Sequence, residues 1–254
     1  MSLLLCVDYD GTLTPIVAHP SRARLSARTK QLLKRLASLP GVRVALVSGR
    51  ALRDVRRLVG LRGLCYVGNH GLELQGAGLR YVHPIAQTSR SFMKRLAAQL
   101  RTALQLIRGA EVEDKGLTVS LHWRRVPRSA SRAFHRLVGQ YLAPHRRKGV
   151  IRITQGKRVI EVRPPVAWDK GRIIAWILGQ MAGQARWTSP FVIYLGDDRT
   201  DEDAFRLVNR RRGLSVFVGR SNHRTAARHR LQTPLEAAHW LSRVVAWRTH
   251  TPIR

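Results

Sequence analysis

The chain has 254 residues, of which 44% are hydrophobic, and it carries a formal net charge of +31. This length suits one large domain, or a core domain that carries a smaller one. No apolar run approaches the roughly 20 residues that a membrane-spanning helix needs, which argues against a membrane protein. Met1 precedes the first apolar run almost directly, without a basic segment, so we expect no signal peptide and a cytoplasmic location.

The positive charge comes almost entirely from arginine, and such a charge attracts polyanions. The arginines are scattered along the whole chain, however, and we find no RNA-binding aromatic motif, zinc-finger spacing or basic leucine zipper. We therefore do not expect nucleic acid to be the partner. Cys6 and Cys65 both lie in apolar stretches that read as strands, which indicates buried thiols in a reducing compartment.

The first apolar run, residues 3–7, ends in two carboxylates, Asp8 and Asp10, followed by Gly11. A continuous apolar run is typical of a central strand that is buried on both faces of an α/β sheet. Ligands bind at the carboxyl ends of such strands. Two acids held together there repel each other, and a divalent cation would compensate them most simply.

The elements that follow alternate between helix and strand, at the spacing of a parallel sheet with crossover helices. Helices are predicted over 26–39 and 51–59, and strands over 42–47 and 64–67. Each strand ends in a polar turn.

From residue 73 onward the pattern changes to paired strands with two longer helices. In chain order we expect a hairpin of 72–74 with 79–82, a helix over 88–108, strands 111–114 and 117–123, a helix over 129–142 that stops near Pro144, and strands 150–154 and 157–162. Paired strands of this kind predict an α+β insert with an antiparallel sheet, over residues 73–164.

The helix–strand alternation returns near Trp168. A helix over 169–181, a strand over 191–195, a helix over 200–208 and a strand over 214–218 are predicted. Thr233, Pro234 and Glu236 then open the final helix with a capping box. The fold class is therefore α/β, with a Rossmann-like core of a central parallel sheet, made of residues 1–72 and 165–254, that an α+β cap domain interrupts.

Polar side chains follow several strands of this one sheet, and the carboxyl ends of parallel strands meet in space. Acids beside a hydroxyl group and a lysine suit a hard cation with a phosphate next to it. The strand-end residues are Asp8 and Asp10, then Ser48, Gly49 and Arg50, then Asn69, His70 and Gly71, and finally Asp197, Asp198, Asp201 and Asp203.

This ordered set resembles the four motifs of the haloacid dehalogenase superfamily and, more narrowly, the trehalose-6-phosphate phosphatases with their C2B-type cap. The first motif is Asp8 to Thr12, Ser48 is the second, Lys170 the third and the segment from Gly196 to Asp201 the fourth. The segments that match the phosphatases are Asp8–Pro15, Ser48–Arg50, Gly68–Gly71, Glu113–Gly116, His122–Arg124, Gly156–Pro164, Lys170–Gly171 and Gly196–Asp203.

The resemblance implies a phosphatase in which Asp8 attacks phosphorus and forms an aspartyl phosphate. Asp10 would protonate the sugar oxygen and later accept a proton from water. Ser48 and Lys170 would hold the phosphoryl oxygens.

The same resemblance implies Mg²⁺ as the cofactor, held by Asp8, the backbone carbonyl of Asp10 and Asp197. Asp201 would be a further ligand or orient a metal-bound water. The residues alone leave open whether Asp198 or Asp201 serves the metal.

The insert would be a mobile cap that selects the sugar through bidentate hydrogen bonds to its hydroxyl groups. The substrate-binding residues that match the family are Arg50, Asn69, His70 and Gly71 in the core, and Glu113, Lys115, His122, Arg124, Glu161 and Arg163 in the cap. The substrate would be trehalose 6-phosphate, as a step of trehalose biosynthesis, and a trehalose-6-phosphate synthase is a possible partner.

Two other readings stay open at this point. One is another sugar-phosphate phosphatase with the same kind of cap, such as the sucrose-phosphate or the glucosyl- or mannosylglycerate-phosphate type. The other is a binding protein that keeps the fold and uses its basic surface. The acidic residue Asp10, two positions after the nucleophile, argues for a phosphatase and against the ATPase branch of the superfamily, which has threonine there.

Overall fold

The computed structural model describes residues 2–17, 22–156, 158–183, 187, 189–220 and 224–250. By its internal contacts the chain divides into two compact units. Unit 1 comprises Met1–Tyr81 with Trp168–Arg254, and unit 2 comprises Val82–Ala167. Among the described residues, no helix has both the length and the apolar character needed to cross a membrane.

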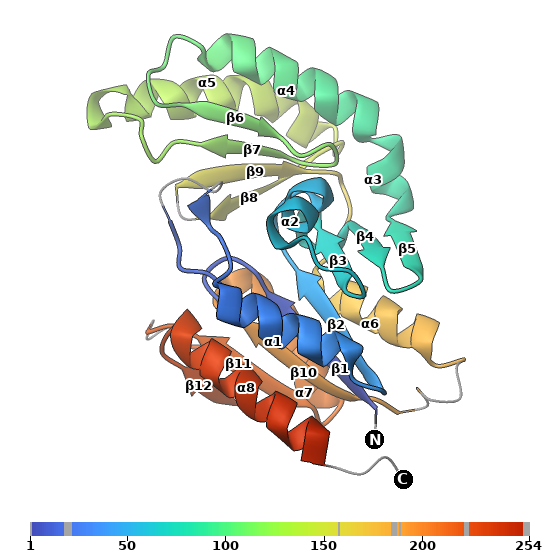
Figure 1. Ribbon diagram of the computed structural model, residues 1–254. Coiled ribbons are helices and arrows are strands. Elements are labelled where there is room, and N and C mark those ends of the chain that lie inside the picture. Colours follow the sequence, from blue (N-terminus) through green and yellow to red (C-terminus); the bar gives the residue numbers. More distant parts are fainter. Residues whose placement is uncertain are drawn as a thin grey trace. The chain divides into compact units, whose positions relative to one another are not determined.

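Unit 1 is built on one eight-stranded sheet (Figure 1). Its strand order is β12 (His229–Leu231), β11 (Leu214–Val218), β10 (Phe191–Gly196), β1 (Leu3–Asp8), β2 (Val42–Val47), β3 (Cys65–Gly68), β4 (Glu73–Gly76) and β5 (Leu79–Val82). The six strands from β12 to β3 pair in parallel, and β4 pairs with β3 in the antiparallel sense. The predicted α/β class with a central parallel sheet is confirmed.

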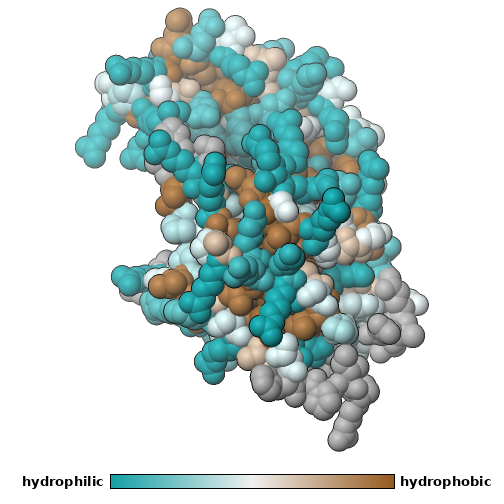
Figure 2. Space-filling view, in the orientation of Figure 1, coloured by the Kyte–Doolittle hydropathy of each residue, from teal (hydrophilic) through white to brown (hydrophobic). Residues whose placement is uncertain are grey.

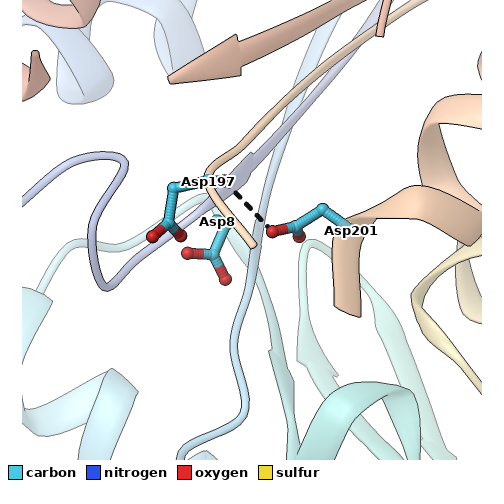
Figure 3. Close-up of side chains that lie close together, drawn as sticks. All are labelled: Asp8, Asp197 and Asp201. Carbon is cyan, nitrogen blue, oxygen red and sulfur yellow. Dashed lines mark hydrogen bonds between the residues drawn. The ribbon is translucent and has the colours of Figure 1, made fainter. Parts of the chain in front are cut away.

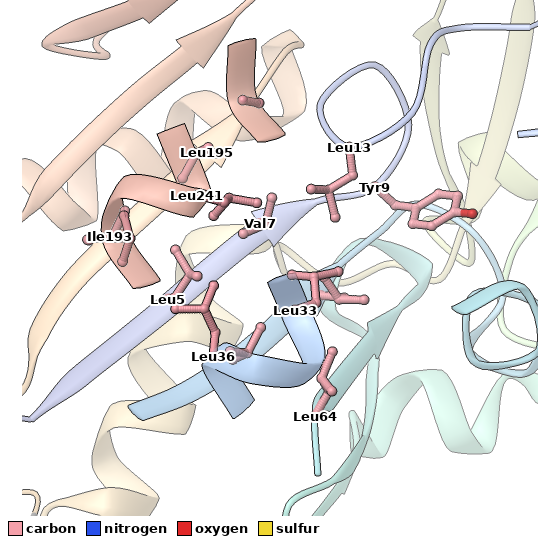
Figure 4. Close-up of a cluster of buried hydrophobic side chains, with 14 of the residues drawn as sticks. Leu5, Val7, Tyr9, Leu13, Leu33, Leu36, Leu64, Ile193, Leu195 and Leu241 are labelled. Carbon is pink, nitrogen blue, oxygen red and sulfur yellow. The ribbon is translucent and has the colours of Figure 1, made fainter. Parts of the chain in front are cut away.

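Strand β1 lies in the middle of this sheet and is buried along its whole length. Leu3, Leu5 and Val7 face the helices α1 (Ala27–Ser38), α2 (Leu52–Val59) and α8 (Pro234–His250), a cluster drawn in Figure 4. Leu4 and Cys6 face α6 (Lys170–Met181) and α7 (Glu202–Arg210) on the other side. Because helices cover both faces of the sheet at β1, every residue of the strand is buried and its apolar run is unbroken.

The order of the strands reverses at β1. The chain proceeds from β1 to β2 and β3 on one side, and later returns to place β10 and β11 on the other. In open α/β sheets this switch point leaves a crevice at the carboxyl ends of the two strands, where ligands bind. Asp8 ends β1 and Asp197 directly follows β10, so the topology alone places these two acids at the crevice.

One expectation about the insert is wrong. The hairpin of β4 and β5 does not join the antiparallel sheet of the cap but extends the large sheet, with Leu74 opposite Val67. Tyr81 stacks on Trp168, at 5.5 Å between ring centroids, and packs on Trp176 of α6. These contacts keep the hairpin in unit 1, so the boundaries lie after Tyr81 and before Trp168 instead of at residues 73 and 165.

Unit 2 is a four-stranded antiparallel sheet with helices on one face (Figure 1). The strand order is β6 (Glu111–Asp114), β7 (Val119–His122), β9 (Val159–Arg163) and β8 (Arg152–Gly156), and the helices are α3 (Pro84–Thr88), α4 (Arg90–Leu104) and α5 (Arg128–Arg147). The apolar sides of α4 and α5 pack on Val119, Leu121, Ile160 and Val162. Position 157, where we expected β9 to begin, lies outside the described residues.

Several element ends differ from the prediction. Helix α5 continues past Pro144 to Arg147, because a proline in the last exposed turn removes only one backbone donor and the Lys148 N–H still bonds to its carbonyl. The segment predicted as the helix 200–208 begins with a short 3₁₀ turn, Arg199–Asp201, before α7. Strand β12 was not predicted, since three residues with two basic side chains carry no apolar pattern.

Candidate active site

Three carboxylates meet at the carboxyl end of the parallel sheet (Figure 3). Asp8, Asp197 and Asp201 each offer a carboxylate oxygen, and these oxygens lie within 4.8 Å of one another. Gly11 makes this approach possible, because a Cβ there would clash with the Asp197 carboxylate, and its φ of +86° also favours glycine. The glycine after Asp10 is therefore part of the site's construction.

Lys170 is the cation that pairs with this acidic cluster. It is the first residue of α6, whose N-cap Asp169 accepts a hydrogen bond from the Arg172 N–H. The Lys170 Nζ donates to one oxygen of Asp8 and to one oxygen of Asp201, each at 2.7 Å, and its side chain is only 3% exposed. Burial alone would lower the pKa of Lys170, but the charges of Asp201 and Asp8 outweigh it and raise the pKa, which keeps the ammonium charged.

Asp201 is fully buried, and four donors surround its carboxylate. Lys170 and the Tyr194 hydroxyl donate to Oδ1, and the backbone N–H groups of Asp197 and Asp198 donate to Oδ2. A carboxylate with its oxygens occupied in this way holds the loop after β10 in place and fixes Lys170 against Asp8. This arrangement favours a positioning role for Asp201 over direct metal ligation.

The sequence reasoning missed Tyr194. It lies inside the apolar strand β10, is fully buried, and donates to Asp201 Oδ1 at 2.5 Å. Burial and the nearby Asp201 charge raise the pKa of Tyr194 well above its ordinary value, so the hydroxyl stays protonated and acts as a donor. The only signal in the sequence is a tyrosine, whose hydroxyl needs a partner, in a strand that is otherwise aliphatic after Phe191.

The cluster carries more negative than positive charge, since one ammonium faces three carboxylates. Burial, followed by the charges of Asp201 and Asp197, raises the pKa of Asp8 well above its ordinary value, although Lys170 opposes this rise. A bound divalent cation would compensate the excess negative charge of the three carboxylates. Hard cations such as Mg²⁺ prefer carboxylate oxygens. The donor set of the site therefore fits a divalent metal.

Asp10 does not join the three carboxylates through its side chain. Arg50 binds both of its oxygens, with Nε at 2.6 Å from Oδ2 and one terminal nitrogen at 2.5 Å from Oδ1. The guanidinium also lies 5.4 Å from the centre of the Tyr9 ring. Ser48 is buried, and its Oγ accepts a hydrogen bond from the Arg50 N–H.

The turn after β3 supports the loop that carries Ser48. Asn69 and His70 have positive φ angles, and their backbone N–H groups bond to the carbonyls of Arg50 and Ser48. The Asn69 amide donates to Glu73 Oε1 at 2.6 Å, and that oxygen also accepts from the Leu52 N–H. Asn69, which the resemblance marks as substrate-binding, is thus fully buried and tied to Glu73, a residue that the sequence reasoning did not select.

Close packing in the same turn depends on glycines. The His70 ring lies against Gly49, where a Cβ would clash with it, and a Cβ at Gly71 would approach Ile173 of α6. The side chain of Trp168 donates from Nε1 to the Gly71 carbonyl at 2.7 Å. The segments after β2 and β3 and the start of α6 therefore form one packed support for Ser48 and Lys170.

In unit 2, the residues expected to bind the sugar share one face of the antiparallel sheet. The register places Glu113 opposite Ser120, Ser120 opposite Glu161, and Arg163 two residues after Glu161 on β9. His122 lies two residues after Ser120 and so faces the same way. The opposite face is the apolar one that α4 and α5 cover.

One ion pair and one hydrogen bond between side chains organise this polar face. Lys115 Nζ lies 2.9 Å from Glu161 Oε1, with both side chains about nine-tenths buried, and the Ser120 hydroxyl donates to the same oxygen. His122 Nε2 lies 2.8 Å from Glu113 Oε2. Arg124 follows the end of β7 and is exposed. The structure thus brings five of the six predicted cap residues onto one surface: Glu113, Lys115, His122, Glu161 and Arg163.

Comparison with known proteins decides the family. Residues 6–234 match the family model described as trehalose-phosphatase. The chain belongs to the trehalose-phosphatase family. It is 35% identical over 260 residues to a probable trehalose-phosphate phosphatase H of Arabidopsis thaliana, which covers 97% of this chain and 72% of that protein. It is 36% identical over 255 residues to a trehalose-phosphate phosphatase of Mycobacterium bovis, covering 97% of this chain and 62% of that protein.

Solved structures agree with this assignment at the level of the fold. The C-terminal domain of a Candida albicans trehalose-6-phosphate phosphatase superposes with a TM-score of 0.80 at 24% identity, covering 97% of this chain and 93% of that one. A haloacid dehalogenase-like hydrolase from Bacteroides thetaiotaomicron gives a TM-score of 0.66 at 16% identity, covering 96% of this chain and all of that one. The fold is therefore like that of a haloacid dehalogenase-like hydrolase, and the family confirms the prediction of a phosphatase enzyme.

Proposed function

We propose that this trehalose-phosphatase family member hydrolyses trehalose 6-phosphate to trehalose and phosphate, in the cytoplasm, as a step of trehalose biosynthesis. The observation that carries this proposal is the pairing of Asp8 with a buried Lys170 beside Asp197 and Asp201, in a chain whose family relatives are named for this phosphatase activity. A trehalose-6-phosphate synthase would be the partner that supplies the substrate.

Each side chain at the sheet end has a task in the proposed reaction. One Asp8 oxygen attacks phosphorus, the bond between phosphorus and the sugar oxygen breaks, and Asp10 gives that oxygen a proton. Water then attacks the aspartyl phosphate while Asp10 accepts a proton, so that phosphate leaves and the Asp8 carboxylate is restored. Ser48 and Lys170 supply a hydroxyl and an ammonium to the phosphoryl oxygens.

Arg50 has to change partners during this sequence. It holds both oxygens of Asp10, so this pair opens before Asp10 can exchange a proton with the sugar oxygen. A guanidinium binds phosphate oxygens as well as it binds a carboxylate, which makes the phosphoryl group of the substrate a suitable second partner.

We propose Mg²⁺ as the cofactor, held by the carboxylates of Asp8 and Asp197 and the backbone carbonyl of Asp10. When bound, the ion neutralises charge on the nucleophile and on the phosphoryl oxygens. Asp201 keeps its four donors and positions Lys170 and the Asp197–Asp198 backbone. We give Asp198 no metal role, because its side chain accepts the Asp201 N–H in the capping box that opens the 3₁₀ turn, while its own N–H donates to Asp201 Oδ2.

Two asparagine substitutions separate a metal ligand from a positioning residue. Asp197→Asn is expected to raise the Mg²⁺ concentration for half-maximal activity at least about tenfold, and to reduce the stabilisation that Mg²⁺ gives in thermal melts. Asp201→Asn is expected to lower kcat and the melting temperature with little change in the Mg²⁺ requirement. An equal shift in Mg²⁺ requirement for both variants would assign Asp201 to the metal.

The polar face of unit 2 would contact the sugar. The substrate-binding proposal includes Glu113, Lys115, His122, Arg124, Glu161 and Arg163. Carboxylates and ammonium groups in defined rows can hydrogen-bond to several hydroxyl groups, and a wrong sugar leaves buried polar atoms unpaired. The Lys115–Glu161 pair is the most buried of these contacts. A sugar that leaves its polar atoms without hydrogen bonds should therefore lose the most binding free energy at this pair.

A panel of phosphorylated sugars tests the substrate. With Mg²⁺ present, we expect phosphate release with the highest kcat/KM from trehalose 6-phosphate, compared with sucrose, glucosylglycerate, mannosylglycerate and glucose phosphates. Glu161→Gln is expected to lower kcat/KM for trehalose 6-phosphate by roughly tenfold or more, while hydrolysis of p-nitrophenyl phosphate, which has no sugar, stays within about twofold. A higher kcat/KM for another sugar would overturn the substrate, and no release from any of them would overturn the activity.

A further inference from the structure

Unit 2 contains a groove that takes no part in the proposed reaction. It has a volume of about 570 Å³ and lies between α5 and the strands β8 and β9. Ligand sites for small organic molecules span roughly 300–1,000 Å³. The groove opens on the helix-covered side of the sheet, since Ile153 and Ile160 alternate with the residues of the polar face.

The floor of the groove is aliphatic. Val138 and Leu142 of α5 face Ile153 of β8 and Ile160 of β9 across it. Strand β8 is the edge strand of the sheet, so α5 has no further strand to pack against beyond it. Ile153 is the partly exposed residue of the floor, whereas Val138, Leu142 and Ile160 line the groove from the buried core with exposed fractions of 3%, 1% and 6%.

The rim of the groove is basic. Arg146 and Arg147 line it from the last turn of α5, both are exposed, and neither forms an ion pair within the described part of the chain. None of the lining residues is acidic; the others with polar side chains are His135 and Gln155. Helix α5 as a whole contains five arginines and no acidic residue, so no charge of its own neutralises this rim.

Gly139 offers a position from which the groove can be blocked. It lies in the middle of α5 and lines the groove, and a Cβ built there would meet no atom within 4 Å. A helix interior loses roughly 1 kcal/mol with glycine instead of alanine. A methyl group at this position would touch nothing, whereas a side chain as large as tryptophan would extend into the groove.

We propose that this groove binds a small aliphatic carboxylate, with its hydrocarbon chain on the Val138–Leu142–Ile153–Ile160 floor and its carboxylate between Arg146 and Arg147. The aliphatic floor would contact the hydrocarbon chain, and the two guanidinium groups would pair with the carboxylate. The site does not depend on the phosphatase reaction, because none of the residues proposed for catalysis or sugar binding lines it.

Displacement of a fluorescent anion tests the site on the full chain. The probe is 8-anilinonaphthalene-1-sulfonate, with decanoate as the competitor and decanol, of equal chain length, as the neutral control. We expect one saturable site from which decanoate displaces the probe at a concentration at least about tenfold lower than decanol does. Arg146→Gln with Arg147→Gln should remove this preference for the acid.

Gly139→Trp should block the groove and weaken decanoate binding by about tenfold or more. Gly139→Ala is the matched control, which should bind decanoate as the unmodified protein does, and Gly179→Trp places a tryptophan at an equally open glycine of α6. Circular dichroism and thermal melts show that each variant is folded. Unchanged decanoate binding in Gly139→Trp, or equal displacement by decanol and decanoate, would overturn the proposal, whatever the enzyme assays show.

Discussion

Asp8→Asn is expected to reduce phosphate release from trehalose 6-phosphate by ~10⁴-fold or more, the scale of removing a nucleophile. Asparagine has nearly the same shape as aspartate but lacks the charged oxygen that would attack phosphorus. The amide oxygen can still accept a hydrogen bond from Lys170, so the site should stay assembled. The measurement is phosphate release with Mg²⁺, at substrate concentrations well above KM.

Thermal melts distinguish a variant that has lost only its nucleophile from one that no longer folds. Burial already raises the pKa of Asp8, which means that its charge is costly in the folded protein, and the neutral amide removes part of that cost. We therefore expect Asp8→Asn to melt at the same temperature as the unmodified protein or higher in EDTA. Asp54→Asn, at a half-buried acid beside the exposed Arg57, is the control and should keep full activity. Residual activity of Asp8→Asn above about one percent of the unmodified rate would contradict a nucleophilic role.

The parts of the site that could be predicted from the sequence are those that the backbone positions. Asp8 and Asp197 directly end or follow apolar strands, so the topology of a parallel sheet brings them together without any knowledge of side chains. Lys170 was selected only through the resemblance to the third motif, because a lysine near the start of a helix is by itself an ordinary surface residue; in the structure it is the first residue of α6, after the N-cap Asp169. Gly11 and Gly196 mark turns where an acid approaches the backbone closely.

The parts that could not be predicted depend on side-chain partners from distant segments. Arg50 was assigned to the substrate, yet it binds Asp10, because strand order makes their loops neighbours across 40 residues of sequence. Tyr194 and Glu73 belong to no sequence motif. Only the structure shows that Tyr194 hydrogen-bonds to Asp201 and Glu73 to Asn69. The hairpin of β4 and β5 was assigned to the cap because paired strands begin there, but β4 pairs with β3 and Tyr81 packs on Trp168 and Trp176 of unit 1.

Hydrophilic side chains are widely distributed over the face of the protein that Figure 2 shows. They do not gather in one band there. Several of the described acidic residues are buried, among them Asp201 and Glu161, and so add no negative charge to the surface. The arginines are scattered along the sequence, and the groove of unit 2 combines two of them with an aliphatic floor.

Lys170→Met is expected to lower the free energy of unfolding by about 3 kcal/mol near neutral pH in EDTA, because it leaves two buried carboxylates without their cation. Methionine replaces most of the buried stem, so the loss reports mainly the charge. The activity should fall as well, since the phosphoryl group loses the ammonium that would face it. Lys94→Met, at an exposed position of α4, is the matched control and should change the unfolding free energy by less than about 0.5 kcal/mol.

The pH and metal dependence of Lys170→Met identify the cause of its instability. The pKa of Asp8 is already raised in the folded protein, and loss of Lys170 removes the one charge that opposes this rise. A carboxyl group whose folded pKa lies above its unfolded value favours the folded state at low pH, and this contribution is lost as the pH rises through the folded pKa. The deficit relative to the unmodified protein should therefore be smaller near pH 5 than near pH 8. Millimolar Mg²⁺ should restore part of it, because a cation bound by Asp8 and Asp197 compensates the same charges. A deficit that is independent of both pH and Mg²⁺ would show that the methionine disturbs packing and that repulsion between the carboxylates is not the cause.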